Sequence, residues 1–334
     1  MLNVGKLDSQ LLKDIVFKNI RYKREEVLVR AGIGEDCAVL DFGEYECVMS
    51  TDPITAAISE IGRLAIHITC NDIATNGIEP MGIMLAVMLP VGTTQTEVEE
   101  MMKQAGEAAE SLGVEIIGGH TEITPAVNTP VIVSTAIGRS PKGHSKRGKE
   151  IQAGDWILMT KDAGIEGTGI IASDQEDRLA ACLTKEEIEE AKKMLDQVSV
   201  VKEGVLAGHA GVLAMHDITE GGVLGAVWEI CQVSGLGAEV WLEKVPVREV
   251  TKKICSLFDI DYMRLISSGC MLMIVDEEKK QGLVEKLTLE NIKVTAIGRI
   301  LGRENGIQLI QAGRRERIGP PESDELYKII DFNV

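Results

Sequence analysis

Acidic side chains at the ends of predicted elements are the residues best suited to chemistry in this chain. Asp52 ends a strand-like run, and Glu35 and Asp36 follow two closely spaced glycines. Asp72 continues the apolar stripe of a helix predicted over residues 59–76, so it faces inward. Mg2+ prefers oxygen ligands from one or two carboxylates together with water and substrate phosphates. Converging aspartates therefore indicate a site for a nucleotide with its metal.

Asp72 carries most of this interpretation. A buried carboxylate without a partner costs several kcal/mol, so it must be paired, protonated or bound to a cation. The alternative is an acid at the end of a helix that reaches solvent or a nearby arginine such as Arg63. The acids at positions 35, 36 and 52 favour the interpretation that Asp72 binds a cation.

Two glycine-rich segments have the composition to hold phosphate. Gly118 and Gly119, followed by His120 and Thr121, come after a strand predicted over residues 114–117, and glycine lets backbone amides approach an anion closely. An ordinary glycine turn is the alternative for this first segment.

The second segment leaves a predicted strand and opens a helix. Its residues are His216, Asp217, Ile218, Thr219, Glu220, Gly221 and Gly222. The first amides of a helix have no partner within it, and its positive end suits phosphate. A simple threonine cap, with Asp217 favouring the helix dipole, is the alternative.

Composition limits the classes of function. The chain has 334 residues, 45% hydrophobic and 26% charged, which is typical of a globular protein of one or two domains. A net charge of -17 disfavours nucleic acid and anionic membrane surfaces as partners. Seven cysteines without C-x-x-C spacing fit a reducing compartment. Without a signal-peptide pattern or an apolar run of ~18 residues, the expected location is the cytoplasm.

The elements that would position these residues fall into two halves. A capping box at Thr96 and Glu99 predicts an amphipathic helix that ends at Gly113, and Thr184 with Glu187 predicts another. Residues 139–154 interrupt the pattern, so the domains are placed at 1–150 and 151–334. Strands are predicted at 46–51, 81–89, 114–117, 131–137, 155–159, 212–215, 238–242, 270–275, 294–297 and 307–310.

In this order, the motifs resemble the AIR synthase-related (PurM/HypE/ThiL) superfamily across nearly the whole chain. Each motif is short, but their order and spacing together are specific, and the segment N-D-x-A-x-x-G-x-x-P at residues 71–80 is the strongest. The other matching segments are residues 34–40, 50–52, 118–121 and 216–222.

The resemblance implies a two-domain fold, with an N-terminal α/β half that dimerises through its sheet and a C-terminal α+β half. It also implies that ATP and Mg2+ lie in clefts where the N-terminal halves of a homodimer meet. The metal ligands would be Asp36, Asp52 and Asp72. The catalytic residues would be Asp217 and His120. The nucleotide-binding residues would be Lys6, Gly34, Glu35, Gly118, Gly119, Thr121, Thr219, Glu220, Gly221 and Gly222.

Within the superfamily, the HypE branch is the most similar, through residues 216–222 and the segment 261–269. HypE proteins use ATP to dehydrate a carbamoyl group carried on their own C-terminal cysteine. The last cysteine here is Cys270 and the printed sequence ends in residues 329–334, so that self-modification is not carried over. His120 stands where HypE and ThiL typically have aspartate, which leaves the number of metals open.

The leading hypothesis is an ATP- and Mg2+-dependent enzyme that phosphorylates an amide-like or phosphate oxygen of a small-molecule or protein-bound substrate. Thiamine-monophosphate kinase is ranked lower, because its usual Ile-Ser-Asp-Gly sequence does not stand at residues 218–221. A third hypothesis is a non-catalytic assembly protein of the HypE type, which binds a maturation partner protein.

Overall fold

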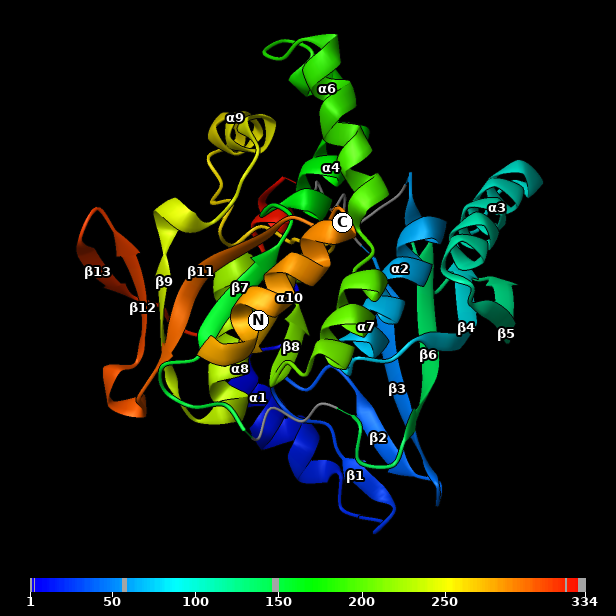
Figure 1. Cartoon of the computed structure of the whole chain (residues 1–334). Helices are drawn as coiled ribbons and strands as arrows, with labels where there is room; N and C mark the ends of the chain where they lie inside the picture. Colours follow the sequence, from blue (N-terminus) through cyan, green and yellow to red (C-terminus); the bar gives the residue numbers. More distant parts are fainter. Residues whose placement is uncertain (1, 3, 56–58, 146–149, 322, 330–334) are drawn as a thin grey trace.

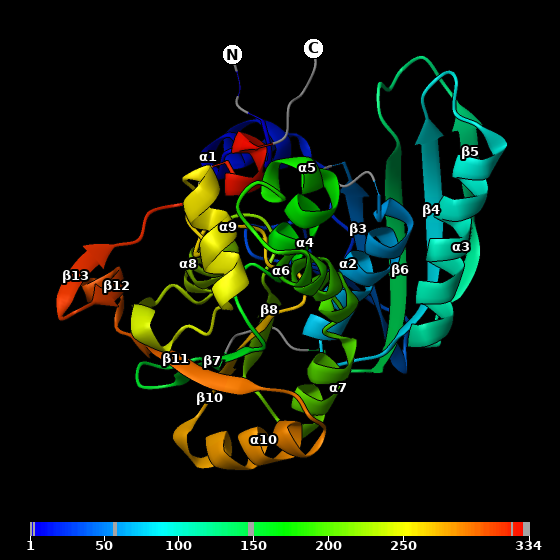
Figure 2. The same cartoon turned by 90° about the horizontal axis from the view of Figure 1, so that it is seen from above.

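Two β-sheets form the frame of the protein, and one helix lies between them. The computed structural model describes residues 2, 4–55, 59–145, 150–321 and 323–329. Helix α2 (Ile61–Thr75) packs against the first sheet on one side, and against α7 (Val201–Ala210) and the second sheet on the other (Figure 1). Seen from above, the two sheets stand on opposite sides of the molecule (Figure 2). Among the described residues, no helix has the length and apolarity that a membrane span requires.

The first sheet has the strand order β1-β2-β3-β6-β4-β5. Only the β4–β5 pair is parallel. Residues of β3 alternate between buried and more exposed positions, as expected for a sheet with one covered face. The strands are β1 (Val27–Val29), β2 (Ala38–Asp41), β3 (Tyr45–Ile54), β4 (Pro80–Leu89), β5 (Glu115–Ile123) and β6 (Val131–Pro141).

The second sheet has the order β13-β12-β9-β11-β7-β10-β8. Strand β10, which lies between β7 and β8, is buried at every residue, which explains its continuous apolar sequence. Only the β12–β9 pair is parallel. The strands are β7 (Trp156–Thr160), β8 (Ala214–Asp217), β9 (Gly237–Trp241), β10 (Met271–Val275), β11 (Val294–Leu301), β12 (Ile307–Gln311) and β13 (Arg314–Arg317).

Helices cover both sheets. Besides α2 and α7, the α-helices are α1 (Ser9–Leu11), α3 (Gln95–Leu112), α4 (Ile165–Asp174), α5 (Glu176–Leu179), α6 (Lys185–Lys192), α8 (Gly222–Ser234), α9 (Glu249–Phe258) and α10 (Glu277–Leu289). A π-helical turn (Leu12–Val16) and short 3-10 turns (Phe17–Asn19, Lys193–Gln197, Leu242–Lys244, Arg303–Asn305 and Glu325–Lys328) complete the described elements.

The predicted strands and helices are present, with shifted ends and two corrections. The first capping box lies at Thr94 and Glu97, because Thr94 has the extended backbone that an N-cap needs. The predicted box at Thr184 and Glu187 is confirmed. The segment with Gly118 is not a loop but part of strand β5. The domain boundary after residue 150 stays a prediction.

Glycines let α7 approach α2 closely. A side chain at Gly204 would place its Cβ 2.4 Å from the carbonyl oxygen of Ala74, and one at Gly208 would place it 2.5 Å from the Cα of Gly77. Real Cβ atoms do not approach other atoms this closely, so both positions require glycine for α7 to contact α2. This pair of glycines therefore fixes how the C-terminal half docks onto the central helix.

We expect Gly204→Ala to lower the free energy of unfolding by about 1–3 kcal/mol, because the added methyl group must push α7 away from α2. Gly282→Ala is the matched control, since the helical Gly282 of α10 has no atom within 4 Å of an added Cβ. This control should be neutral or stabilising by up to about 1 kcal/mol. Urea unfolding of both variants measures the difference, and equal effects would contradict the close-approach argument.

Candidate active site

Four aspartates gather where α2 meets the two sheets. Asp36 precedes β2, Asp52 lies in β3, Asp72 lies in the last turn of α2, and Asp217 ends β8. Their carboxyl groups are close enough to interact electrostatically with one another. The structure thus brings together the three predicted metal ligands and adds Asp217, which is only 1% exposed.

Ser50 of β3 links two of these acids. Its hydroxyl Oγ lies 2.9 Å from the backbone oxygen of Asp36 and also makes a short hydrogen bond with Oδ2 of Asp72. Ser50 has one hydroxyl hydrogen, so it cannot donate to both acceptors. When it donates to Asp36, the contact with Asp72 requires a proton on the Asp72 carboxyl group.

Burial accounts for the protonation of these carboxyl groups. Burial, together with Asp52, Asp217 and Asp36, raises the pKa of Asp72 well above its usual range. Burial, reinforced by Asp36, raises the pKa of Asp217 to about 8, and burial raises that of Asp36 to about 6. Near neutral pH the cluster without a metal therefore holds protons on Asp72 and Asp217.

His216 is the cation inside the cluster. Its Nε2 lies 3.0 Å from Oε2 of Glu229 and 3.4 Å from Oδ1 of Asp36, and its Nδ1 lies 2.7 Å from the backbone oxygen of Asp217. Burial alone would lower the pKa of His216, but Asp36 and Glu229 raise it to about 10. In this charged form both ring nitrogens carry a hydrogen, so neither can bind a metal; in the neutral form His216 offers, with Asp36 and Asp217, one of three ligand atoms that lie within 4.8 Å of one another.

The two ends of the chain meet beside the cluster. The Lys6 side chain is 58% exposed, and its Nζ lies 3.6 Å from Oε1 of Glu229. The backbone N–H of Lys6 donates to Oε2 of Glu220, and the Tyr327 hydroxyl donates to Oε1 of the same carboxylate. Glu220 therefore holds both terminal segments against the start of α8, and Lys6 lies beside the acidic cluster.

The amides at the start of α8 are less free than the sequence predicts. The N–H of Gly221 donates to the buried carboxylate of Asp324, that of Gly222 to the oxygen of Thr219, and that of Leu224 to the oxygen of Met263. Those amides are satisfied within the chain. An anion at this helix end would compete with the carboxylate of Asp324. No sequence motif predicts this role of Asp324.

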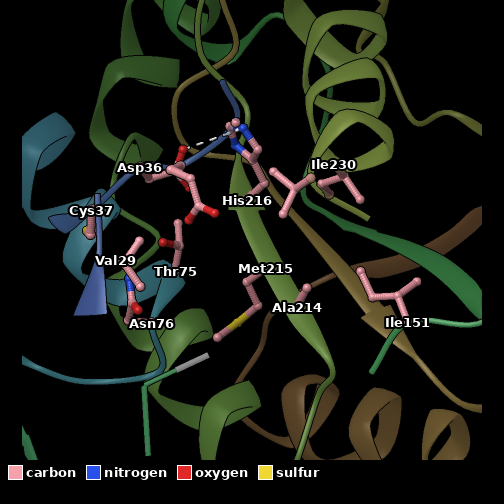
Figure 3. Close-up of a pocket in the computed structure, with 13 residues that line it drawn as sticks. Val29, Asp36, Cys37, Thr75, Asn76, Ile151, Ala214, Met215, His216 and Ile230 are labelled. Carbon is pink, nitrogen blue, oxygen red and sulfur yellow. Dashed lines mark ion pairs between the residues drawn. The ribbon is translucent and has the colours of Figure 1, made fainter. Parts of the chain in front are cut away.

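Gly34 and Glu35 lie on the other side of the cluster. Gly34 has a φ of 77°, and a Cβ there would lie 2.8 Å from the backbone oxygen of Glu229, so the segment passes directly against α8. A cavity of about 40 Å³ opens beside Asp36 and His216, which face each other in Figure 3. It has room for a few water molecules but not for a nucleotide.

The residues of β5 lie apart from the cluster within one chain. Gly118, Gly119, His120 and Thr121 are exposed on the edge strand, three strands from the β3 that carries Asp52, which corresponds to about 14 Å. A Cβ at Gly119 would lie 1.9 Å from the oxygen of Leu85. The glycine is therefore required for strand pairing, and His120 contacts only Glu122 among the described residues, with 3.4 Å between Nε2 and Oε2.

The cluster fits a divalent metal ion. Both carboxylate oxygens of Asp217 and Oδ2 of Asp52 are buried and accept no hydrogen bond from the described residues. Buried acceptors without donors are costly unless they are protonated or bind a cation. Carboxylate oxygens are the ligands that Mg2+ prefers, and Asp36 and Asp217 present ligand atoms within 4.8 Å of each other, beside Asp52 and Asp72.

The fold and the site define a two-domain protein of the PurM-like type. The model of the AIR synthase related protein N-terminal domain matches residues 34–140, and that of the C-terminal domain matches residues 152–309. The chain belongs to this family, which confirms the resemblance drawn from its motifs.

Relatives with similar sequences carry names from hydrogenase maturation. A protein of Methanocaldococcus jannaschii named for hydrogenase expression/formation is 28% identical over 292 residues, covering 85% of this chain and 84% of the relative. The carbamoyl dehydratase HypE of Bradyrhizobium diazoefficiens is 28% identical over 252 residues, covering 73% and 71%.

Solved structures share the fold. HypE in a HypE–HypF complex aligns with a TM-score of 0.76 at 22% identity, covering 93% of this chain and 99% of that one. HypE in complex with ATP aligns with a TM-score of 0.73 at 24% identity, covering 98% of both chains. A ThiL protein complexed with AMPPCP and TMP aligns with a TM-score of 0.75 at 17% identity, covering 96% and 99%.

Sequence reasoning missed Glu229, Asp324 and the role of Ser50. Glu229 stands about two turns into α8, where an acid within an apolar helix was a signal that could have been followed. Ser50, a polar residue on the buried face of β3, was a similar signal.

We expect the free energy of unfolding of the metal-free protein to fall as pH rises from about 4 to 8. The pKa values of Asp36 and Asp217 in the folded state, about 6 and about 8, lie above the ordinary value near 4. Their protonated forms therefore stabilise the fold at low pH, and that stability is lost as each group ionises.

Asp217→Asn should remove part of this loss and raise the stability at pH 8 by on the order of 1–3 kcal/mol. Urea unfolding at pH 5 and pH 8 with a chelator present measures it. Asp177→Asn, at an exposed position of α5, is the control and should leave the pH dependence unchanged. An unaltered slope in Asp217→Asn would contradict the assignment of buried protons.

Proposed function

We propose that this protein is an ATP- and Mg2+-dependent enzyme that phosphorylates the oxygen of an amide-like group, and that it works as a homodimer in the cytoplasm. The observation that carries the proposal is the set of four aspartates from separate segments, with three buried carboxylate oxygens that accept no hydrogen bond from the described residues. The seven cysteines are all free, which fits a reducing compartment.

Asp36, Asp52 and Asp72 would hold the metal ion, joined by the carboxylate of Asp217 when it is ionised, since Asp217 offers a ligand atom within 4.8 Å of one on Asp36. Bound there, Mg2+ neutralises charge on the phosphate oxygens during phosphoryl transfer. The raised pKa values of Asp36 and Asp72 mean that these groups release protons when a cation binds. Metal affinity should therefore increase with pH across the neutral range.

Two cationic groups flank the acids and would orient phosphate. Lys6 is largely exposed, so its ammonium group can leave Glu229 and contact an incoming phosphate. His216 is buried and is held by Glu229 and Asp36, so its charge offsets the acids. Asp217, with a pKa of about 8, can accept or donate a proton near neutral pH, which suits a general acid–base role.

The names of the relatives suggest the class of substrate. A carbamoyl dehydratase removes water from a carbamoyl group. Phosphorylation of the amide oxygen by ATP, with loss of one proton from nitrogen, gives ADP and an imidate phosphate; loss of phosphate and of the second proton from nitrogen then leaves a nitrile. The chain would supply positioning, the cations at Lys6 and His216, and a proton acceptor at Asp217.

ATP with Mg2+ should raise the melting temperature by several degrees, on the order of 5 °C at about 100 times the Kd, because a ligand that binds only the folded state stabilises it. Asp72→Asn should abolish the shift, since it removes a central carboxylate. Asp177→Asn should keep it. A shift that survives in Asp72→Asn would contradict the proposed metal site.

A product assay in oxygen-18 water separates turnover from binding. With a carbamoyl compound as substrate, phosphorylation of its oxygen yields phosphate without label from the solvent, whereas simple ATP hydrolysis yields labelled phosphate. A thermal shift without phosphate release in the presence of any carbamoyl compound, and without phosphorylation of thiamine monophosphate, would favour a non-catalytic assembly protein. Conversion of thiamine monophosphate would favour the kinase.

The homodimer is proposed from the open face of the first sheet. Met84 of β4 is 43% exposed, and Ile117 of β5 is 49% exposed. Helices α2 and α3 cover the opposite face. A second copy on the open face would bury these side chains and could bring His120, Gly118 and Thr121 towards a site that their own chain does not reach.

Met84→Glu should convert a dimer into a monomer, because it places a charge in the proposed interface. Size-exclusion chromatography with light scattering measures the mass. Leu289→Glu, at an 83% exposed position of α10, is the matched control and should stay dimeric. A monomeric wild-type protein, or a Met84→Glu variant that stays dimeric, would contradict this interface.

A further inference from the structure

The segment of residues 197–200 connects the two halves of the active site. It follows α6 and its 3-10 turn, and it leads directly into α7 and then β8, which carries Asp217. From the side of the N-terminal half, Asn71 of α2 binds this segment twice. Its Nδ2 donates to the oxygen of Val198 over 2.8 Å, and its Oδ1 accepts from the N–H of Val200 over 2.8 Å.

Lys161 holds the same segment from the other side. Its Nζ donates to the oxygen of Gln197 over 3.1 Å and to that of Ser199 over 2.5 Å. The same Nζ lies 2.5 Å from Oε1 of Glu203, which is 3% exposed. The ammonium group thus makes two hydrogen bonds to backbone oxygens of the segment and an ion pair with a buried carboxylate.

The two side chains alternate along the segment. Lys161 donates to the backbone oxygens of residues 197 and 199. Asn71 donates to the backbone oxygen of residue 198 and accepts from the backbone N–H of residue 200. Asn71 is fully buried, and Lys161 has a φ of 54°, a backbone conformation that costs free energy for a residue other than glycine. The contacts with the segment must therefore offset an unfavourable free energy at both residues.

The neighbours of these residues belong to the site. Asn71 directly precedes Asp72 on α2, so movement of one moves the other. The segment fixes the start of α7, whose Glu203 binds Lys161 and whose Gly204 contacts Ala74 of α2. Carboxylates from the two halves can share one cation only if their separation is constant, because Mg2+ tolerates little deviation from its preferred geometry.

We propose that Asn71 and Lys161 are positioning residues that hold segment 197–200 and thereby set the separation of Asp72 from Asp217. The inference rests on the proposed function, because it concerns how the two halves present carboxylates to the metal. Neither side chain contacts the metal or the nucleotide. Each acts through the backbone of the segment.

Asn71→Leu tests the first contact, with Thr69→Val as the matched control. Thr69 is also buried in α2, but its hydroxyl bonds Ser134 within the N-terminal half. Both variants lose a buried hydrogen-bonding group and should melt at a lower temperature than wild type. With ATP in excess, the Mg2+ concentration that gives half of the thermal shift should rise at least about tenfold in Asn71→Leu and stay within about twofold in Thr69→Val.

Lys161→Met and Lys161→Arg test the contact of Lys161 with the segment. They also replace Asn71→Leu as the test if that variant does not fold. Lys161→Met should raise the Mg2+ requirement, while Lys161→Arg keeps donors and charge and should restore it in part. Hydrogen exchange of the 197–203 region, measured without nucleotide, should become faster in Asn71→Leu and not in Thr69→Val, because the Val200 amide loses its acceptor.

The outcomes separate this inference from the proposed function. A wild-type protein with no ATP–Mg2+ shift contradicts the proposed function, and then only the exchange data bear on the contacts of Asn71. A normal wild-type shift whose Mg2+ requirement is unchanged in both Asn71→Leu and Lys161→Met overturns the inference and makes these contacts structural only.

Discussion

The structure depends on the burial of α2 from both sides. Most of α2 is shielded from water, with only Arg63 and His67 partly exposed, so the polar side chains of its last two turns need partners within the protein. Thr69 bonds Ser134, Asn71 bonds segment 197–200, and Asp72 bonds Ser50. These partners come from both halves of the chain. The hydrogen bonds that offset the burial of the polar side chains of α2 therefore also align the two halves.

The same burial determines the electrostatics of the site. Four carboxyl groups excluded from water cannot all be ionised without compensation, and the chain compensates with protons and with the imidazolium of His216. Glu229 keeps that imidazolium charged and has its own pKa held near 2, against the effect of burial, by His216 and Lys6. The cluster can therefore bind a cation by releasing protons, and these protons and the imidazolium keep the fold stable without the cation.

The sequence predicts the frame and the aspartates of the site but not the contacts between distant segments. The inward position of Asp72 follows from its place in an apolar stripe, and the structure confirms it. The edge strand β5 was predicted as a loop at Gly118 and Gly119, because glycines that permit close strand pairing have the same local signature as glycines in turns. The capping of Gly221 by Asp324 joins positions 103 residues apart, and local pattern cannot reveal it.

The ends of the chain provide a last consequence. Ser323 bonds the oxygen of Val4, and Gly5 lies against the ring of Tyr327, so the terminal segments run side by side over the start of α8 (Figure 2). A substitution in either of these two segments, at Gly5 or Tyr327 for example, therefore acts directly beside Glu220 and Lys6. A foreign peptide is better inserted in the exposed turn near Gly92, where it would leave these contacts intact.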